Sequence, residues 1–183
     1  MKNLKEYLVP TITLFIICLV ATALLGVTNE VTAPIINELA VETEINSRKE
    51  VFPDAANFGE AQAKGEASIV AALDENGGTI GYVVVNLAKG YGGDVSVMTG
   101  ITTDGKVTGI SILSHSETAG LGAKATGEDF RDQFIGLIKG ITVSKDKAGD
   151  NSIDAITGAT ITSRAVVNAV NEAIELAGGE NIG

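Results

Sequence analysis

The hydrophobic positions divide the chain into an apolar N-terminal run and a longer region of mixed pattern. Residues 8–27 form an uninterrupted stretch without a charged side chain. A helix rises about 1.5 Å per residue, so a helix of this length spans about 30 Å, the thickness of a bilayer's hydrocarbon core. The pattern therefore predicts one transmembrane helix over residues 8–27.

The charges around this run predict its orientation. Lys2 and Lys5 precede it, whereas glutamates follow it and the next positive charge is Arg48. The positive-inside rule then places residues 1–7 in the cytoplasm and the rest of the chain outside a single-pass cell-membrane anchor. An alternative is a cleaved signal peptide, because Ala21-Thr22-Ala23 fits an A-x-A cleavage pattern. Both interpretations predict an exported domain.

Residues 28–65 are predicted to be a stalk, with a helix followed by a linker loop. Pro34 suits the first turn of a helix, Thr32 is a possible cap, and the helix would lead up to Phe52-Pro53. The globular domain is then expected over residues 66–183.

Two pairs of β-rich runs in this domain predict two hairpins. Each pair flanks a turn cluster rich in Asp and Gly, the kind of sequence that closes a hairpin. The predicted strands are 68–73 with 79–87, and 95–103 with 106–113.

Helical patterns follow the hairpins. Residues 126–138 are predicted to be a helix capped by Thr126, with Phe130, Phe134, Leu137 and Ile138 on its buried face, and residues 141–143 a short strand. A second amphipathic helix would begin near residue 160 and end at Gly178-Gly179. The order of elements predicts an α+β fold, an antiparallel sheet of hairpins with packed helices, preceded by one N-terminal transmembrane helix.

Composition excludes several classes of function. The net charge is −10 and the 13 Lys and Arg residues do not cluster, which argues against nucleic-acid binding. The single cysteine, Cys18, lies inside the apolar run, and the chain has one histidine. Disulfides, iron–sulfur ligation and Cys/His zinc sites are therefore not expected.

The strongest candidate for chemistry is the entrance to the last helix, residues 154–164. Hydroxyl side chains gather there at Thr157, Thr160, Thr162 and Ser163. The first turn of a helix also offers unpaired N–H groups and the positive end of its dipole, so an anion is favoured. We interpret this stretch as the attachment site of a phosphate-bearing cofactor.

Two further segments are candidates for contacts with a ligand. The run Gly90-Tyr91-Gly92-Gly93 requires either close backbone approach or positive φ angles. The segment from Ser114 to Gly122 is polar and contains two glycines, so it is either solvated or folded around something.

Together these motifs resemble one family, the FMN-binding domain found in the G subunits of Rnf electron-transport complexes and in the C subunits of the sodium-translocating NADH:quinone reductase. The run Thr157–Thr160 is similar to that family's S/T-G-A-T motif, and residues 115–122 to its H-x-E-T-P-G-L-G segment, with Ala119 in place of proline. The Gly90–Gly93 run, the Ser163-Arg164 pair and the single N-terminal span also fit. The short chain favours the Rnf protein over its longer quinone-reductase relative.

The resemblance implies an FMN whose phosphate is joined to the Thr160 hydroxyl by a separate flavin transferase. Asp154, Thr157 and Thr162 would then shape the loop that the transferase recognises, while Gly158 and Ala159 leave room for it and for the phosphate. The flavin would be contacted from the other side by Glu117, Thr118, Leu121 and Gly122, with Tyr91 and Ser163 completing the cofactor-binding set. His115 is a weaker candidate, and Lys124 or Arg164 would offset the phosphate charge.

The implied function is that of an electron carrier in a membrane complex that couples ferredoxin oxidation and NAD reduction to ion movement, with partner subunits holding the other cofactors. One alternative is a cofactor-free exported binding or scaffold domain, in which Thr160 is only a helix cap. Another is a stand-alone exported reductase domain that binds FMN.

Overall fold

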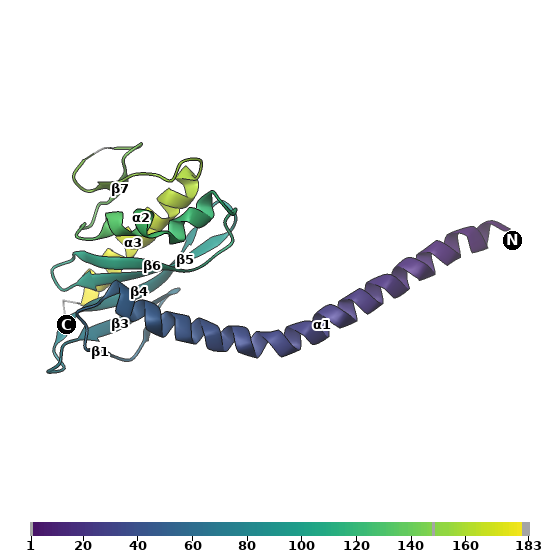
Figure 1. The fold of residues 1–183 in the computed structure, drawn as a ribbon, viewed down its shortest axis with the longest axis horizontal. Coiled ribbons are helices and arrows are strands. Elements are labelled where there is room, and N and C mark those ends of the chain that lie inside the picture. The colour runs from purple at the N-terminus through teal and green to yellow at the C-terminus, as the bar shows by residue number, and fades with distance from the viewer. Residues whose placement is uncertain (1, 148, 181–183) are drawn as a thin grey trace. The chain divides into compact units, whose positions relative to one another are not determined.

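The computed structural model describes residues 2–147 and 149–180 (Figure 1). The chain forms two compact units, Met1–Glu42 and Thr43–Gly183. Residue 1 of the predicted cytoplasmic segment and residues 181–183 of the predicted domain lie outside the described residues.

The first helix, α1, runs without interruption over Lys2–Val51. Among the described residues it is the one helix long and apolar enough to cross a membrane, and its apolar side chains from Leu8 to Val27 are exposed. Residues 28–51 are helical up to Val51, as predicted, but they continue α1 and do not begin a separate stalk helix, because Pro34 lies inside α1. Thr32 is not a cap either: its hydroxyl donates to the Thr28 carbonyl at 2.9 Å, as in a helix interior.

An antiparallel sheet in the order β1-β3-β4-β5-β6, with β2 also paired to β3, forms the centre of the second unit. Both predicted hairpins are confirmed as β3–β4 and β5–β6. At the first turn the Asp74 carboxylate accepts hydrogen bonds from the N–H groups of Asn76 and Gly78, which fixes the reversal. The strands are β1 Asn57–Phe58, β2 Gln62–Lys64, β3 Ala67–Leu73, β4 Thr79–Lys89, β5 Asp94–Thr102 and β6 Val107–His115.

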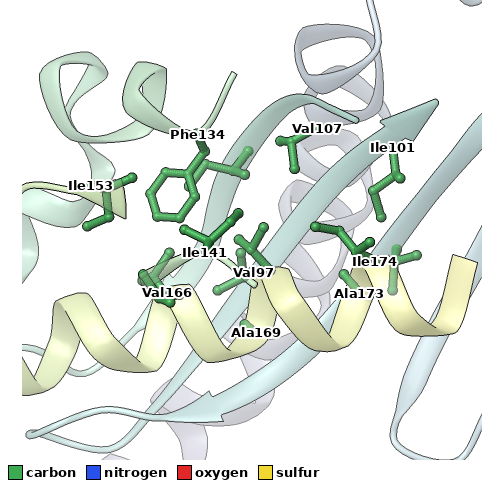
Figure 2. Packing of buried hydrophobic residues seen from close by; sticks show 14 of the residues in the cluster. Val97, Ile101, Val107, Phe134, Ile141, Ile153, Val166, Ala169, Ala173 and Ile174 are labelled. Atoms are coloured by element: carbon green, nitrogen blue, oxygen red, sulfur yellow. The ribbon is translucent and has the colours of Figure 1, made fainter. Parts of the chain in front are cut away.

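The larger core lies between this sheet and α3, Thr160–Glu180. Figure 2 shows α3 presenting Val166, Ala169, Ala173 and Ile174 toward strand residues that include Val97 and Ile101. Residues three and four apart lie on one face of a helix, so α3 buries a single stripe of small and branched side chains against the sheet. This packing fixes where α3 begins, and therefore where the candidate site lies.

The opposite face of the sheet is covered by the end of α1 and the residues just after it. Val51 and Phe52 are buried in a second cluster with Val83 and Met98. The Thr108 hydroxyl donates to the Val51 carbonyl at 2.5 Å. The compact unit therefore includes residues 43–65, which the sequence pattern assigned to a stalk and linker.

The glycines of this face explain how the end of α1 comes so close to the sheet. A Cβ atom on Gly100 would overlap the Val51 carbonyl oxygen, and one on Gly81 would lie 2.7 Å from a Phe52 ring carbon. Gly109 would meet the Val51 Cα at 3.2 Å. The missing side chains therefore make room for Val51 and Phe52.

The helix predicted over residues 126–138 is not formed. The chain has instead three short helical turns: η1 Gly122–Thr126, α2 Glu128–Arg131 and η2 Asp132–Phe134. Gly136 and Leu137 then form backbone hydrogen bonds with Val107 of β6. The chain therefore pairs with the sheet here and does not continue as a helix. Phe130 and Phe134 are buried as predicted, whereas Leu137 is partly buried and Ile138 is exposed. Thr126 caps no helix, since its hydroxyl donates back to the Ala123 carbonyl.

Two further differences concern the C-terminal part. The predicted strand at residues 141–143 is present as β7, Thr142–Val143, and pairs in parallel with β8, Ser152–Ile153, which the sequence pattern did not indicate. α3 also continues through Gly178 and Gly179 to Glu180, so the glycine pair does not end it.

Candidate functional site

The start of α3 is held in place by Ser163. Its hydroxyl accepts a hydrogen bond from the Ile156 N–H and donates one to the Ala159 carbonyl, both at 3.0 Å, and its side chain is fully buried. Ala159 N–H also donates to the Ile156 carbonyl. The turn over residues 156–159 is thereby fastened to the helix, with Thr160 as the first helical residue, as predicted.

Gly158 forms the sharpest point of this turn. Its φ of +82° belongs to the left-handed region, which residues with a side chain rarely adopt. A Cβ atom here would also lie 3.1 Å from a methyl carbon of Leu121. Gly158 therefore brings the segment after Glu117 and the entrance of α3 together.

Glu117 joins three segments through its two carboxylate oxygens. Oε1 accepts hydrogen bonds from the N–H groups of Tyr91 and Gly92, at 2.7 and 3.1 Å. Oε2 accepts the Thr162 hydroxyl at 2.8 Å. The glycine-rich turn after β4 and the first turn of α3 are thus fastened to the same side chain.

The glycines around Glu117 are explained by close approach. An added Cβ would overlap a Glu117 carboxylate oxygen at both Gly90 and Gly122, and the Ser116 carbonyl oxygen at Gly92. The Gly90–Gly93 run therefore approaches the Glu117 loop closely, as its glycines indicated, and Gly93 also has a positive φ of +154°.

A cavity of about 530 Å³ opens where these segments meet. Its exposed apolar side chains are Tyr91, Leu121 and Ile161, while Thr160 and Thr162 present hydroxyls at the start of α3. The lining residues are Tyr91, Glu117, Thr118, Leu121, Gly122, Lys145, Gly158, Ala159, Thr160, Ile161 and Thr162.

Most of the predicted cofactor-binding residues line this cavity, but three do not. Ser163 is buried behind it. Asp154 and Thr157 line a different cavity, of about 550 Å³, together with residues of η1 and α2. The Asp154 carboxylate accepts the Ser144 hydroxyl at 2.6 Å. His115 does not line the cavity at Thr160 either; its Nδ1 accepts the Glu117 N–H at 3.2 Å, which orients the loop.

The charged groups at the cavity differ from those expected. Lys124 belongs to the Asp154 cavity, and Arg164 forms an ion pair with Asp146. The Arg164 guanidinium lowers the pKa of Asp146 through this hydrogen-bonded contact. The cation that lines the cavity beside Thr160 is Lys145, which sequence reasoning missed because it lies in a polar loop without a motif. Ile161 was missed as well, although it directly follows Thr160.

The second unit is an α+β domain with a cavity at the start of α3, and residues 90–175 match the family model described as an FMN-binding domain. Every residue that lines the cavity falls inside the matched range.

Relatives that cover almost the whole chain identify the family. The chain is 41% identical to the G subunit of the Na⁺-translocating ferredoxin:NAD⁺ oxidoreductase complex of Acetobacterium woodii, covering 89% of this chain and 87% of the relative. It is 37% identical to the proton-translocating counterpart of Clostridium ljungdahlii, covering 95% and 93%. It is 34% identical to the G subunit of the ion-translocating oxidoreductase complex of Methanosarcina acetivorans, covering 96% of each chain.

The chain therefore belongs to the family of G subunits of ion-translocating ferredoxin:NAD⁺ oxidoreductase complexes, and the resemblance inferred from its motifs is confirmed.

Solved structures show the same fold at lower identity. NqrC of Shewanella oneidensis aligns with a TM-score of 0.50 at 20% identity, covering 71% of this chain and 70% of that one. The C subunit of the Na⁺-translocating NADH-quinone reductase from Parabacteroides distasonis aligns with a TM-score of 0.51 at 22% identity, covering 63% and 61%. The predicted α+β class is thereby confirmed.

Proposed function

We propose that this chain carries FMN in the cavity at the start of α3, joined by its phosphate to the Thr160 hydroxyl. It would act as an electron carrier in a membrane complex that couples electron transfer between ferredoxin and NAD to ion translocation. The main support is that the cavity with Thr160 at its wall lies inside the region that matches an FMN-binding domain.

The residues of the cavity fit such a cofactor. Its volume, about 530 Å³, lies within the range of about 300–1,000 Å³ that small-ligand sites occupy. Exposed apolar groups on Tyr91, Leu121 and Ile161 suit the faces of an aromatic ring system. The N–H groups and dipole at the start of α3 favour a phosphate beside Thr160.

Each lining residue has a role in this proposal. Thr160 bears the phosphate, Gly158 and Ala159 leave space beside it, and Leu121 packs on the ring system. The Thr118 hydroxyl would donate a hydrogen bond to a carbonyl or nitrogen of the flavin. Glu117 and Thr162 shape the site by bonding to each other rather than by contacting the cofactor.

The bound FMN would supply the redox chemistry. The chain's contribution is to position that group, to exclude water from one side of it and to set the charge around it. Partner subunits of the complex would deliver and remove electrons.

The membrane topology belongs to the same proposal. α1 would anchor the chain by a single span over residues 8–27, with residues 1–7 in the cytoplasm and the domain outside. A flavin transferase would load the cofactor. A covalent link suits an exported domain, because a dissociated flavin could not readily be replaced there.

Denaturing gel electrophoresis of the chain co-expressed with a flavin transferase tests the attachment. The wild-type chain is expected to give a fluorescent band and an intact mass raised by that of FMN less one water, because the ester forms by condensation. Thr160→Ala should lose both, while Thr126→Ala, which removes a hydroxyl outside this cavity, should keep both.

Two results would contradict the proposal in different ways. A fluorescent Thr160→Ala band would show that the flavin is attached elsewhere. A wild-type chain that carries no flavin after co-expression would remove covalent FMN altogether and favour a cofactor-free domain.

A further inference from the structure

Lys145 is the only positively charged side chain among the described residues that line the cavity. Its side chain is exposed, and no hydrogen bond or ion pair joins its ammonium group to another described residue. Two other cations were expected near the phosphate. Arg164 forms an ion pair with Asp146, and Lys124 lines the Asp154 cavity. Lys145 is therefore a cation at the cavity wall without a protein partner among the described residues.

The loop that carries Lys145 is anchored on both sides of it. Before it, the Ser144 N–H donates to the Ile153 carbonyl, and the Ser144 hydroxyl donates to Asp154. After it, the Asp146 carboxylate accepts two hydrogen bonds from the Arg164 guanidinium. Two-point pairing of this kind fixes direction as well as distance. The backbone of Lys145 is consequently held between β8 and α3.

The anchor on α3 explains why Lys145 lies beside Thr160. Thr160 and Arg164 are four residues apart, so they occupy the same face of the helix on successive turns. Asp146 is hydrogen-bonded to Arg164, one turn after Thr160, so the loop that carries Lys145 is held next to the first two turns of α3. Both Lys145 and Thr160 line the same cavity, in agreement with this placement.

A loaded cavity would contain two negative charges, which a cation at this position would stabilise. Glu117 is a carboxylate, and a phosphate joined to Thr160 as a diester would keep one further negative charge. Like charges in one site destabilise each other unless a cation or hydrogen-bond donors lie between them. The Glu117 oxygens are already satisfied by Tyr91, Gly92 and Thr162, which leaves the phosphate to be compensated.

We propose that Lys145 is the cationic partner of the cofactor phosphate, a positioning residue that holds this group against the first turn of α3. This inference rests on the proposed function, because it requires a phosphate at Thr160. The positive charge that compensates the phosphate would then come from Lys145, in the loop after β7, and not from Lys124 or Arg164.

Chemical modification of lysines tests the assignment directly. Flavin-loaded wild-type chain and flavin-free Thr160→Ala chain are treated with limiting acetic anhydride, and acetylation of each lysine is measured by peptide mass spectrometry. Loading should reduce the reactivity of Lys145 about two- to fivefold, as expected of an exposed amine engaged in an ion pair. Lys147 in the same loop and Lys124 beside the other cavity should react equally in both forms.

Equal reactivity of Lys145 in the two forms would overturn the inference while leaving FMN at Thr160 intact. The intact mass of each sample separates this result from failure of the proposed function, because a wild-type chain without added FMN mass would overturn both.

The phosphorus resonance of the bound cofactor gives a second, independent measurement. In ³¹P NMR of the loaded chain, Lys145→Gln should shift the phosphodiester signal, and Lys145→Arg should return it toward the wild-type position. Lys147→Gln, which removes the same charge two residues away, should leave it unchanged. A signal that is the same in wild type and Lys145→Gln, or one that moves equally with Lys147→Gln, would overturn the assignment.

Discussion

At the scale of single residues, Glu117 does more to build the site than any other side chain. Its carboxylate joins the turn after β4 to α3, and the residue it bonds to on α3 is 45 positions away in sequence. Every hydrogen bond it accepts comes from a neutral donor. These contacts use both carboxylate oxygens as acceptors, and none of them is an ion pair.

Substitutions of Glu117 should separate its role as an acceptor from its negative charge. Glu117→Gln keeps a carbonyl oxygen for the Tyr91 and Gly92 N–H groups and is expected to fold almost normally. Glu117→Ala leaves those donors and the Thr162 hydroxyl without their partner, and should lower the free energy of unfolding by about 1–3 kcal/mol.

Hydrogen exchange of the Tyr91 and Gly92 amides measures the same contact locally, and exchange should accelerate in Glu117→Ala only. If Glu117→Gln were as damaging as Glu117→Ala, the charge itself would be the important property.

Asp146 offers a test of the loop that carries Lys145. The Arg164 guanidinium lowers the pKa of Asp146 below its ordinary value of 3.8. A group with a lowered pKa in the folded state stabilises that state fully above its unfolded pKa, and the contribution disappears as the pH falls through the folded pKa. The loop anchor should thus be intact near neutral pH and should be released only at acid pH, below 3.8.

Arg164→Gln is expected to return the pKa of Asp146 to its ordinary range, measured by the carboxyl carbon shift in an NMR titration. Asp104 provides the internal control, because its pKa is lowered by contacts with Lys106 and Thr102 in the β5–β6 turn and should not respond. An unchanged Asp146 titration would show that the ion pair does not hold the loop in solution.

At the scale of elements, predictions from sequence were reliable where local signals and tertiary packing agree. Both hairpins combine alternating side chains with turns that Asp and Gly favour, and both are present. The start of α3 was predictable for the same reason. The cavity segments at Tyr91, Glu117 and Thr160 were found because glycines and hydroxyls gather there.

The failures occur where contacts with distant residues decide the local structure. Phe130 and Phe134 have helical spacing, but the chain after them turns at Gly136, whose φ is +81°, and bonds to β6. The parallel pairing of β7 with β8 involves strands of two residues each, too short for a periodic signal. Lys145 is positioned by the contacts of its neighbours Ser144 and Asp146 with Asp154 and Arg164. No local sequence pattern indicates these contacts.

The contact between α1 and the sheet can be tested at Gly100. A Cβ atom there would overlap the Val51 carbonyl oxygen and crowd the Thr108 hydroxyl that bonds to it. Gly100→Ala should therefore displace the end of α1 and lower the free energy of unfolding by about 1–3 kcal/mol, the usual cost of overpacking.

Gly59→Ala is the matched control, since its Cβ would meet the nearest atom, the Ala71 Cβ, at an ordinary 3.6 Å. Denaturant unfolding of both variants in detergent provides the comparison. Equal stability of Gly100→Ala and wild type would mean that α1 does not pack on this face in solution.

At the scale of the whole molecule, the chain contributes an FMN-binding domain and one candidate membrane helix to a family of complex subunits. The relatives it matches over most of their length are named as subunits of larger complexes. Electron entry and exit are thus best studied with partner subunits present.

The buried end of α1 also decides where this anchor can be exchanged for another. Val51 and Phe52 are part of the domain's own core, and Ser47 and Glu50 bond to Ser111 and Arg131. A chimera that joins a foreign membrane span to this domain should therefore place its junction before Thr43. A junction at residue 53 or later would remove one wall of the domain together with the anchor.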